Sequence, residues 1–192
     1  MKIAIDIDDT LTNSFDYFIP FVAEFFGAAP EQLRRDNISY STLPEEWRKR
    51  EPEFCRAYYD RVVPDTPFRE NAVRYVNLLH EEGHRIVIIT ARTREMYTDP
   101  YATTRAELDK NGLQYDEIVC TMDKTRACTE RGIDLLIDDS VANCRAAASA
   151  GVRVLLFSGK GNAGTDVPFA RVNDWEEIYL LIRRGLPTTQ SK

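Results

Sequence analysis

Short apolar segments alternate along this chain with amphipathic segments that end at a glycine, and no other feature of the sequence restricts the fold as strongly. The apolar segments are residues 2–7, 85–89, 118–120, 135–137 and 152–157. They are rich in valine, isoleucine and leucine, which is typical of strands that are buried on both faces of a parallel sheet. The sequence therefore predicts a sheet of mostly parallel strands.

Helical patterns fill the gaps between these strands. They cover residues 71–82, 103–111, 124–131 and 141–150, and a glycine follows each of them. Glycine just past a helix is a common C-terminal signal, because it adopts the left-handed conformation without strain. Parallel neighbours need crossovers on the faces of the sheet, so we predict an α/β fold, a three-layer α/β/α sandwich with a Rossmann-like sheet. A last helix is expected at residues 174–184.

Residues 13–68 interrupt the alternation, because they separate the first strand from the helix that should follow it. This insertion contains two helical patterns, at residues 15–26 and 45–61. Since it leaves directly from the first strand, we expect a helical cap over the carboxyl edge of the sheet, placed as a lid. We therefore predict a core of residues 1–12 and 69–187, a cap of residues 13–68 and a flexible tail of residues 188–192.

Composition excludes several classes of partner. The formal net charge is −6, which argues against binding of nucleic acid polymers or anionic membranes, since both need a basic surface. The first apolar run is too short for a signal peptide, and no run approaches the ~18 residues of a membrane helix. We expect a cytoplasmic protein with four buried free thiols, because the cysteines lack metal-binding spacing. An exposed aromatic face on the cap could support a homodimer.

Polar side chains follow the predicted strands and the turns after them. Asp6 and Asp8 close the first strand, Thr90 the second, and Lys124 begins the helix after the third, while Asp138 and Asp139 close the fourth. The carboxyl ends of parallel strands meet at one edge of a sheet, so we expect these groups to converge. Neighbouring carboxylates repel unless a cation joins them, and Mg²⁺ is the natural partner for oxygen ligands.

Each of these residues also has a purely structural interpretation. The first two aspartates could be turn or capping residues, Thr90 could end a strand, and Asp139 could cap the next helix. Lys124 could be a surface residue, although a positive charge at a helix start opposes the helix dipole. Arg92 could reach a substrate phosphate or pair with a surface acid. The order and spacing of the whole set favour a phosphoryl-transfer site.

The set resembles the motifs of the haloacid dehalogenase-like superfamily of phosphohydrolases. The DIDDTL segment at residues 6–11 matches its first motif, Thr90 the second, Lys124 the third and the aspartate pair at 138–139 the fourth. The insertion stands where that superfamily carries small helical caps. Within the superfamily, the chain is similar to the 5′(3′)-deoxyribonucleotidase-like branch. The similarity lies in the IITAR segment at 88–92, the YDEI segment at 115–118 and the LIDDSVAN segment at 136–143.

The resemblance implies a division of roles. Asp6 would attack phosphorus and become an aspartyl phosphate, and Asp8 would act as general acid and then as general base. The carboxylates of Asp6 and Asp138, with the backbone carbonyl of Asp8, would hold Mg²⁺. Thr90, Ala91 and Lys124 would bind the phosphoryl group. Residues expected to support the site or contact the substrate are Thr10, Phe15, Tyr17, Phe18, Arg92, Asp139 and Asn143.

The expected function is therefore magnesium-dependent hydrolysis of a small phosphomonoester, with a nucleoside monophosphate as the substrate that the branch resemblance implies. A sugar phosphate is the alternative substrate. A phosphoacceptor signalling module is the alternative of another class, because receiver domains also combine acids, threonine and lysine around an aspartyl phosphate. The insertion and the acid at Asp8 argue against that module.

Overall fold

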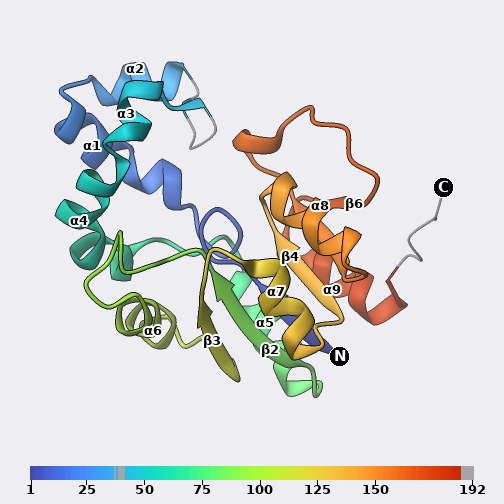
Figure 1. The fold of residues 1–192 in the computed structure, drawn as a ribbon. Coiled ribbons are helices and arrows are strands. Elements are labelled where there is room, and N and C mark those ends of the chain that lie inside the picture. The colour runs from blue at the N-terminus through green and yellow to red at the C-terminus, as the bar shows by residue number, and fades with distance from the viewer. Residues whose placement is uncertain (37, 39–41, 187–192) are drawn as a thin grey trace.

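A parallel sheet forms the centre of the molecule (Figure 1). The computed structural model describes residues 1–36, 38 and 42–186, and within them six strands pair in the order β3-β2-β1-β4-β5-β6, all parallel. The strands are β1 (Lys2–Ile5), β2 (Arg85–Thr90), β3 (Glu117–Cys120), β4 (Leu135–Asp138), β5 (Arg153–Phe157) and β6 (Ala170–Val172). This arrangement confirms the predicted fold class.

Two strand predictions need correction. The first strand ends at Ile5 rather than at residue 7, because the chain turns after Asp6 and the carbonyl of Ile7 accepts three backbone N–H groups. The sequence pattern predicts no strand at β6, an edge strand of only three residues, Ala170–Val172. So short a segment carries too few residues to display a strand pattern.

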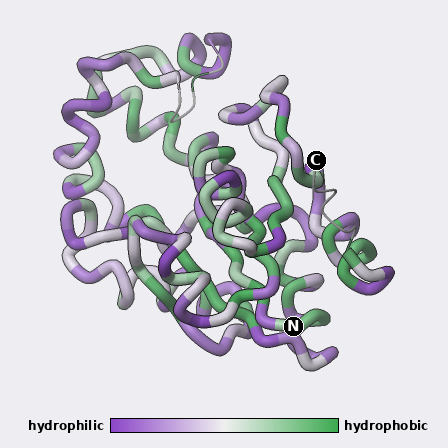
Figure 2. Tube along the Cα trace, turned by 45° about the vertical axis from the view of Figure 1, so that its right-hand side comes forward, coloured by the Kyte–Doolittle hydropathy of each residue, from purple (hydrophilic) through white to green (hydrophobic). Residues whose placement is uncertain are grey.

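Helices cover both faces of the sheet and close two separate apolar cores. The core helices are α5 (Ala72–Glu81), α6 (Pro100–Lys110), α7 (Lys124–Arg131), α8 (Val141–Ser149) and α9 (Trp175–Arg184). Ile3 and Ile5 of β1 pack with α5 and α9 on one face, while Ala4 packs with α7 and α8 on the other. Figure 2 colours much of the chain in the middle of the molecule green, for hydrophobic residues. This alternation along β1 is what the two buried faces of a parallel sheet require.

Helix α6 begins three residues before the predicted start. Asp99 caps it by accepting a hydrogen bond from the backbone N–H of Ala102 at 3.0 Å, and Pro100 occupies the first turn. Proline is favoured there, because its missing N–H would have no partner inside the helix. The Asp-Pro pair was therefore the sequence signal for this helix start.

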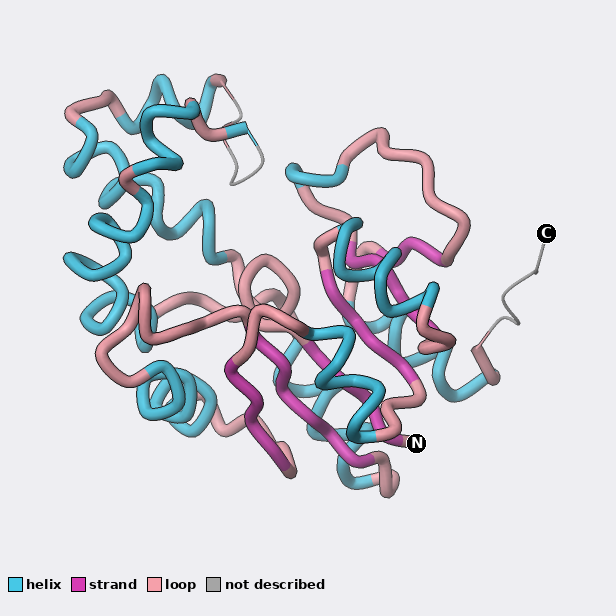
Figure 3. Tube along the Cα trace, viewed as in Figure 1, coloured by secondary structure: helices cyan, strands magenta, loops and turns pink. Residues whose placement is uncertain are grey.

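The insertion consists of helices and loops throughout its described part (Figure 3). Its helices are α1 (Ser14–Phe26), α2 (Pro30–Arg35), α3 (Glu45–Lys49) and α4 (Glu51–Val62), followed by the 3₁₀ turn η2 (Val63–Asp65). The single helix predicted at 45–61 is wrong, since the chain breaks at Arg50. Pro52 explains the break, because it cannot donate to the carbonyl four residues earlier and its ring collides with that carbonyl.

The two connections between insertion and core run side by side. Thr12 forms an antiparallel bridge with Phe68, and the backbone N–H of Asn13 donates to the carbonyl of Pro67 at 3.0 Å. The division at residues 13 and 68 stays a prediction, as does the assignment of the tail at 188–192, which lies outside the described residues. Here the insertion is named the cap.

Two further expectations concern the surface and the thiols. None of the helices in the described residues combines the length and apolarity needed to span a membrane. Cys55, Cys128 and Cys144 are free and buried, as predicted, whereas Cys120 is free and half-buried.

Candidate active site

The loops after β1 and β4 meet where the strand order reverses direction. From β1 the chain proceeds outward through β2 and β3, and then returns to β4 on the other side of β1. Such a switch point leaves a crevice at the carboxyl ends of the strands. Asp6 and Asp138 lie on its two sides, and the backbone N–H of Asp6 donates to the carbonyl of Ile137 at 3.0 Å.

Lys124 joins two of the predicted site residues. Its Nζ lies 2.6 Å from Asp6 Oδ1 and 2.9 Å from Asp138 Oδ2, and all three side chains are buried. Burial raises the pKa of Asp6 to about 7, with Asp138 and Asp8 adding to the shift although Lys124 opposes it. The two carboxylates also explain why a lysine is tolerated at a helix N-terminus, since they offset its charge there.

Asp138 is held from several directions. The Nδ2 of Asn143 donates to both of its carboxylate oxygens, at 3.2 and 3.1 Å, and the backbone N–H of Ser140 donates to Oδ1 at 2.7 Å. Asn143 therefore holds the Asp138 carboxylate from the first turn of α8. The structural alternative for Asp139 is wrong, because Ser140 is the residue that caps α8.

Three carboxylates form a candidate cation site. Asp6, Asp138 and Asp139 each offer an oxygen that lies within 4.8 Å of the others. Burial and the nearby charges of Asp6 and Asp138 hold the pKa of Asp139 well above its usual range. Lys124 neutralises part of this charge, and an excess of negative charge remains. A divalent cation that prefers oxygen ligands fits such a donor set.

Asp8 has a different environment from Asp6, although only one residue separates them. Arg92 donates to both Asp8 oxygens, from Nε at 3.1 Å and from Nη2 at 3.0 Å. Ser14, the first residue of α1, donates from Oγ to Asp8 Oδ1 at 2.8 Å. Burial acts to raise the pKa of Asp8, but the Arg92 charge and these hydrogen bonds lower it overall.

The surface-acid interpretation of Arg92 is wrong. The side chain is 2% exposed and pairs with the half-buried Asp8 and the fully buried Glu107. Its donors point to protein carboxylates, and a contact with a substrate phosphate stays a prediction. Sequence patterns gave no sign of Glu107, a buried glutamate in the middle of α6.

Two predicted threonines each carry an unpaired buried hydroxyl. Thr90 closes β2 and is fully buried, and its Oγ1 has no hydrogen-bond partner among the described residues. The same holds for Oγ1 of Thr10, whose carbonyl accepts from Trp175 Nε1 at 3.2 Å. Ala91 follows β2 and is half-buried. A buried donor without a partner is unusual, and a phosphoryl oxygen could satisfy that of Thr90.

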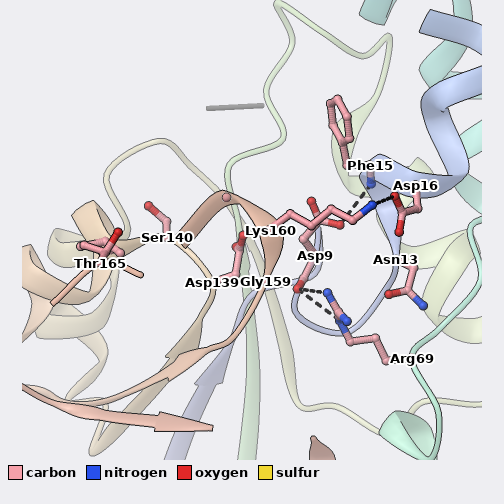
Figure 4. A pocket seen from close by; sticks show the side chains of 12 residues that line it. Asp9, Asn13, Phe15, Asp16, Arg69, Asp139, Ser140, Gly159, Lys160 and Thr165 are labelled. Atoms are coloured by element: carbon pink, nitrogen blue, oxygen red, sulfur yellow. Dashed lines mark hydrogen bonds and ion pairs between the residues drawn. The ribbon is translucent and has the colours of Figure 1, made fainter. Parts of the chain in front are cut away.

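A cavity of about 460 Å³ opens beside Asp139 and Asp9 (Figure 4). Its lining comes from the loop after β1, the start of α1, Arg69, the start of α8 and the glycine-rich loop at 159–165. The glycine-rich loop therefore forms one wall of the cavity. Lys160 reaches across it, with Nζ at 2.6 Å from Asp16 Oδ1.

The sequence predicts substrate contacts for three cap aromatics, Phe15, Tyr17 and Phe18. In the part of the chain that the structure describes, Phe15 is the one of the three that lines this cavity. Phe18 is 1% exposed and stacks on Tyr59 at 5.2 Å inside the cap, which is a core position. Tyr17 is half-buried and packs edge to face with Phe21 at 5.8 Å. Arg69 also lines the cavity, although the sequence pattern did not predict it as a site residue. Its Nη2 donates to the carbonyl of Asp9 at 2.8 Å.

Solved structures share this architecture. A predicted phosphatase from Clostridium acetobutylicum has a TM-score of 0.67 at 17% identity, with 95% of this chain and 98% of that chain covered. A haloacid dehalogenase-like hydrolase from Streptococcus pneumoniae has a TM-score of 0.65 at 13% identity, with 94% and 97% covered. A predicted phosphoglycolate phosphatase from Haemophilus somnus also reaches 0.65, at 15% identity and the same coverage. Comparison with curated proteins found no match.

Fold and motifs together define a phosphohydrolase of the haloacid dehalogenase-like superfamily. The family model described as 5′ nucleotidase, deoxy (pyrimidine), cytosolic type C matches residues 1–186. The chain belongs to this family, which makes it a phosphoric monoester hydrolase.

Proposed function

We propose that this protein dephosphorylates nucleoside monophosphates in a magnesium-dependent reaction that passes through phosphorylated Asp6. The observation that carries the proposal is the buried contact of Lys124 with Asp6 and Asp138, beside a third carboxylate on Asp139. It combines a carboxylate nucleophile, a fixed positive charge and a set of oxygen ligands. Phosphoryl transfer requires this combination of positioning and charge neutralisation.

The residues fit a magnesium ion. Asp6 and Asp138 would hold it by their carboxylates and Asp8 by its backbone carbonyl, and Asp139 supplies a further carboxylate close by. The raised pKa values of Asp6 and Asp139 reflect burial and crowded negative charge, which a cation relieves. When bound, the cation neutralises charge on the transferring phosphoryl group.

The side chains of the protein account for the two steps of hydrolysis. An oxygen of Asp6 forms a bond to phosphorus while the bond from phosphorus to the leaving oxygen breaks, and Asp8 gives that oxygen its proton. Asp8 then takes a proton from water, whose oxygen attacks phosphorus and displaces Asp6, releasing phosphate. Lys124 offsets the charge on Asp6, and the Thr90 hydroxyl donates to a phosphoryl oxygen.

The protonation of Asp8 has to change between these steps. Arg92 favours the ionised carboxylate, which suits the base step. The acid step needs the protonated form, and the negative charge of a bound phosphate raises the pKa of a neighbouring carboxyl. Substrate binding therefore favours the state that the first step uses.

The cavity of about 460 Å³ provides the site for the leaving group. This volume lies within the usual range for small-molecule pockets. Phe15 lines it, although its side chain is 4% exposed and belongs to the buried apolar cluster of the cap, and Arg69, Lys160 and Thr165 contribute polar groups. Such polar groups suit the sugar of a nucleoside, which forms hydrogen bonds, and the family description favours that class.

A substrate panel tests the proposal. It should contain deoxynucleoside and ribonucleoside monophosphates and sugar phosphates, each assayed with Mg²⁺ and with excess chelator. We expect steady release of phosphate from nucleotides with Mg²⁺ and loss of activity with chelator. Preferential turnover of sugar phosphates would overturn the substrate class. A phosphorylated protein that persists without steady turnover would instead support a signalling module.

A further inference from the structure

Glu107 is a fully buried acid that belongs to none of the sequence motifs. It lies in α6, is 0% exposed, and its Oε2 accepts a hydrogen bond from Arg92 Nη1 at 2.5 Å. Its other oxygen, Oε1, has no hydrogen-bond partner among the described residues. Burying a carboxylate is costly unless it is paired, so its contact with Arg92 has to compensate for that cost.

Arg92 connects Glu107 to Asp8 through opposite sides of one guanidinium group. Nη1 donates to Glu107 and, at 3.4 Å, to Thr104 Oγ1, while Nε and Nη2 donate to the two oxygens of Asp8. The guanidinium is planar and rigid, so fixing one side also fixes the direction of the donors on the other. The orientation of the Asp8 carboxylate therefore depends on Glu107.

Aromatic rings shield this connection from water. The ring of Tyr97 lies 5.8 Å from the Arg92 guanidinium carbon and is 3% exposed. Tyr59 of the cap packs against Tyr97 with ring centroids 5.1 Å apart. In such surroundings the ion pairs hold their geometry more strongly than they would in water.

We propose that Glu107 is a positioning residue that acts through Arg92 to hold the Asp8 carboxylate in the orientation needed for proton transfer. The inference rests on the proposed function, because it assigns Glu107 a part in the acid and base steps of Asp8. A purely structural role, in which the pair merely ties the loop after β2 to α6, is the alternative. The two differ in whether the effect of Glu107 requires the carboxylate of Asp8.

The test is the Glu107→Gln variant, alone and combined with Asp8→Asn. Glutamine keeps the shape and one oxygen acceptor but removes the charge that anchors Arg92. We expect kcat to fall about 10- to 100-fold, the size of loss that a small misplacement of a reacting group causes. We expect KM to stay within about two-fold, because the side chain is remote from the cavity, and Glu107→Gln to cause no further loss once Asp8 is Asn.

Glu117→Gln is a matched control. Glu117 also pairs with an arginine, Arg131, at 2.8 Å, but it lies at the start of β3, away from the carboxyl edge of the sheet. It should leave kcat unchanged in both backgrounds. If Glu107→Gln retains wild-type kcat, or lowers it by the same factor with Asp8 and with Asn at position 8, the positioning role is wrong.

Two measurements keep the inference separate from folding and from the proposed function. If Glu107→Gln does not fold, Glu107→Asp replaces it, since aspartate keeps the charge but its shorter side chain shifts the anchor of Arg92, and the same dependence on Asp8 is expected. Crystal structures of wild type and variant compare the Asp8 orientation directly. An unchanged Asp8 would overturn the inference, whereas absence of phosphatase activity in wild type would overturn the proposed function alone.

Discussion

Two groups of side chains at the same edge of the sheet shift the pKa of an aspartate in opposite directions. In the Asp6 cluster (Asp6, Lys124, Asp138, Asp139), three carboxylates lie close together and one lysine pairs with two of them, and burial with this crowding raises the pKa of Asp6 to about 7. In the Asp8 cluster (Asp8, Ser14, Arg92, Glu107), paired donors from arginine outweigh burial and lower the pKa of Asp8. A single turn of the chain thus separates the Asp6 cluster, which has an excess of negative charge, from the Asp8 carboxylate, whose charge is neutralised.

The difference corresponds to the two tasks that hydrolysis requires. The excess negative charge of the Asp6 cluster is an unfavourable arrangement that a bound cation would relieve. Such local strain is common where function rather than stability selects the side chains. In the Asp8 cluster the donors of Arg92 and Ser14 satisfy the Asp8 carboxylate within the protein, which fixes its direction. The same conservative substitution should therefore have different consequences in the two clusters.

Replacing the proposed nucleophile should give the largest loss of activity. For Asp6→Asn we expect phosphatase activity to fall roughly 10³- to 10⁶-fold, since binding and charge stabilisation alone remain. The metal-free protein should be as stable as wild type or more stable, because one crowded carboxylate is removed. Assays with Mg²⁺ and urea unfolding without it measure the two effects. Wild-type activity in a folded Asp6→Asn protein would exclude Asp6 as nucleophile.

Asp8→Asn should lower phosphatase activity less than Asp6→Asn does, but it should lower the free energy of unfolding more. Asp8→Asn removes a proton donor and acceptor, so we expect activity to fall about 10²- to 10⁴-fold. Arg92 keeps Glu107 but loses its second ionic partner in the interior, which should lower the free energy of unfolding by about 1–3 kcal/mol. Mass spectrometry during turnover should still detect phosphorylated Asp6.

Asp109→Asn provides the comparison for stability. Asp109 pairs with Arg105 on the exposed face of α6, with Nε at 3.2 Å from Oδ2. Exposed pairs of this kind contribute little, so its free energy of unfolding should change less than that of Asp8→Asn. Equal losses in the two variants would show that the Asp8 pair behaves as a surface pair.

The two clusters also differ in how far the sequence predicts them. The Asp6 cluster follows from local patterns, because Asp6 and Asp138 close apolar runs and Lys124 begins a helix that the structure confirms at Lys124–Arg131. Parallel strands bring such positions to one edge whatever the rest of the chain does. Sequence reasoning placed Asp139 only as a supporting residue, since the meeting of three carboxylates depends on side-chain directions.

The Asp8 cluster depends on packing between distant segments. Asp8 and Arg92 are 84 positions apart, and Arg92 and Glu107 are 15 apart. Nothing in the local pattern around Glu107 distinguishes it from an exposed glutamate of an amphipathic helix. The Asp-Pro pair at residues 99–100 indicates where α6 begins, but the bounds of a helix do not determine which side chain Glu107 contacts.

The Asp6 cluster should also set the pH dependence of stability in the metal-free protein. An aspartate whose pKa rises from 3.8 to about 7 on folding binds more protons folded than unfolded between these values. The free energy of unfolding therefore falls as pH rises through this range. Asp9, raised to about 6 by burial, and Glu107, raised to about 7 by burial, act in the same direction. Asp8, with its lowered pKa, stays ionised and contributes no slope there.

Thermal unfolding from pH 5 to pH 8 tests this smallest effect. Without metal we expect Tm to fall with rising pH, by about 2–4 °C for each kcal/mol lost. Mg²⁺ should reduce the fall, because the cation favours the ionised carboxylates. Asp6→Asn should also flatten the curve, whereas Asp109→Asn should leave its slope unchanged. A metal-free Tm that rises over this range, or a slope that Asp6→Asn does not alter, would mean that crowding at Asp6 does not distinguish the two clusters.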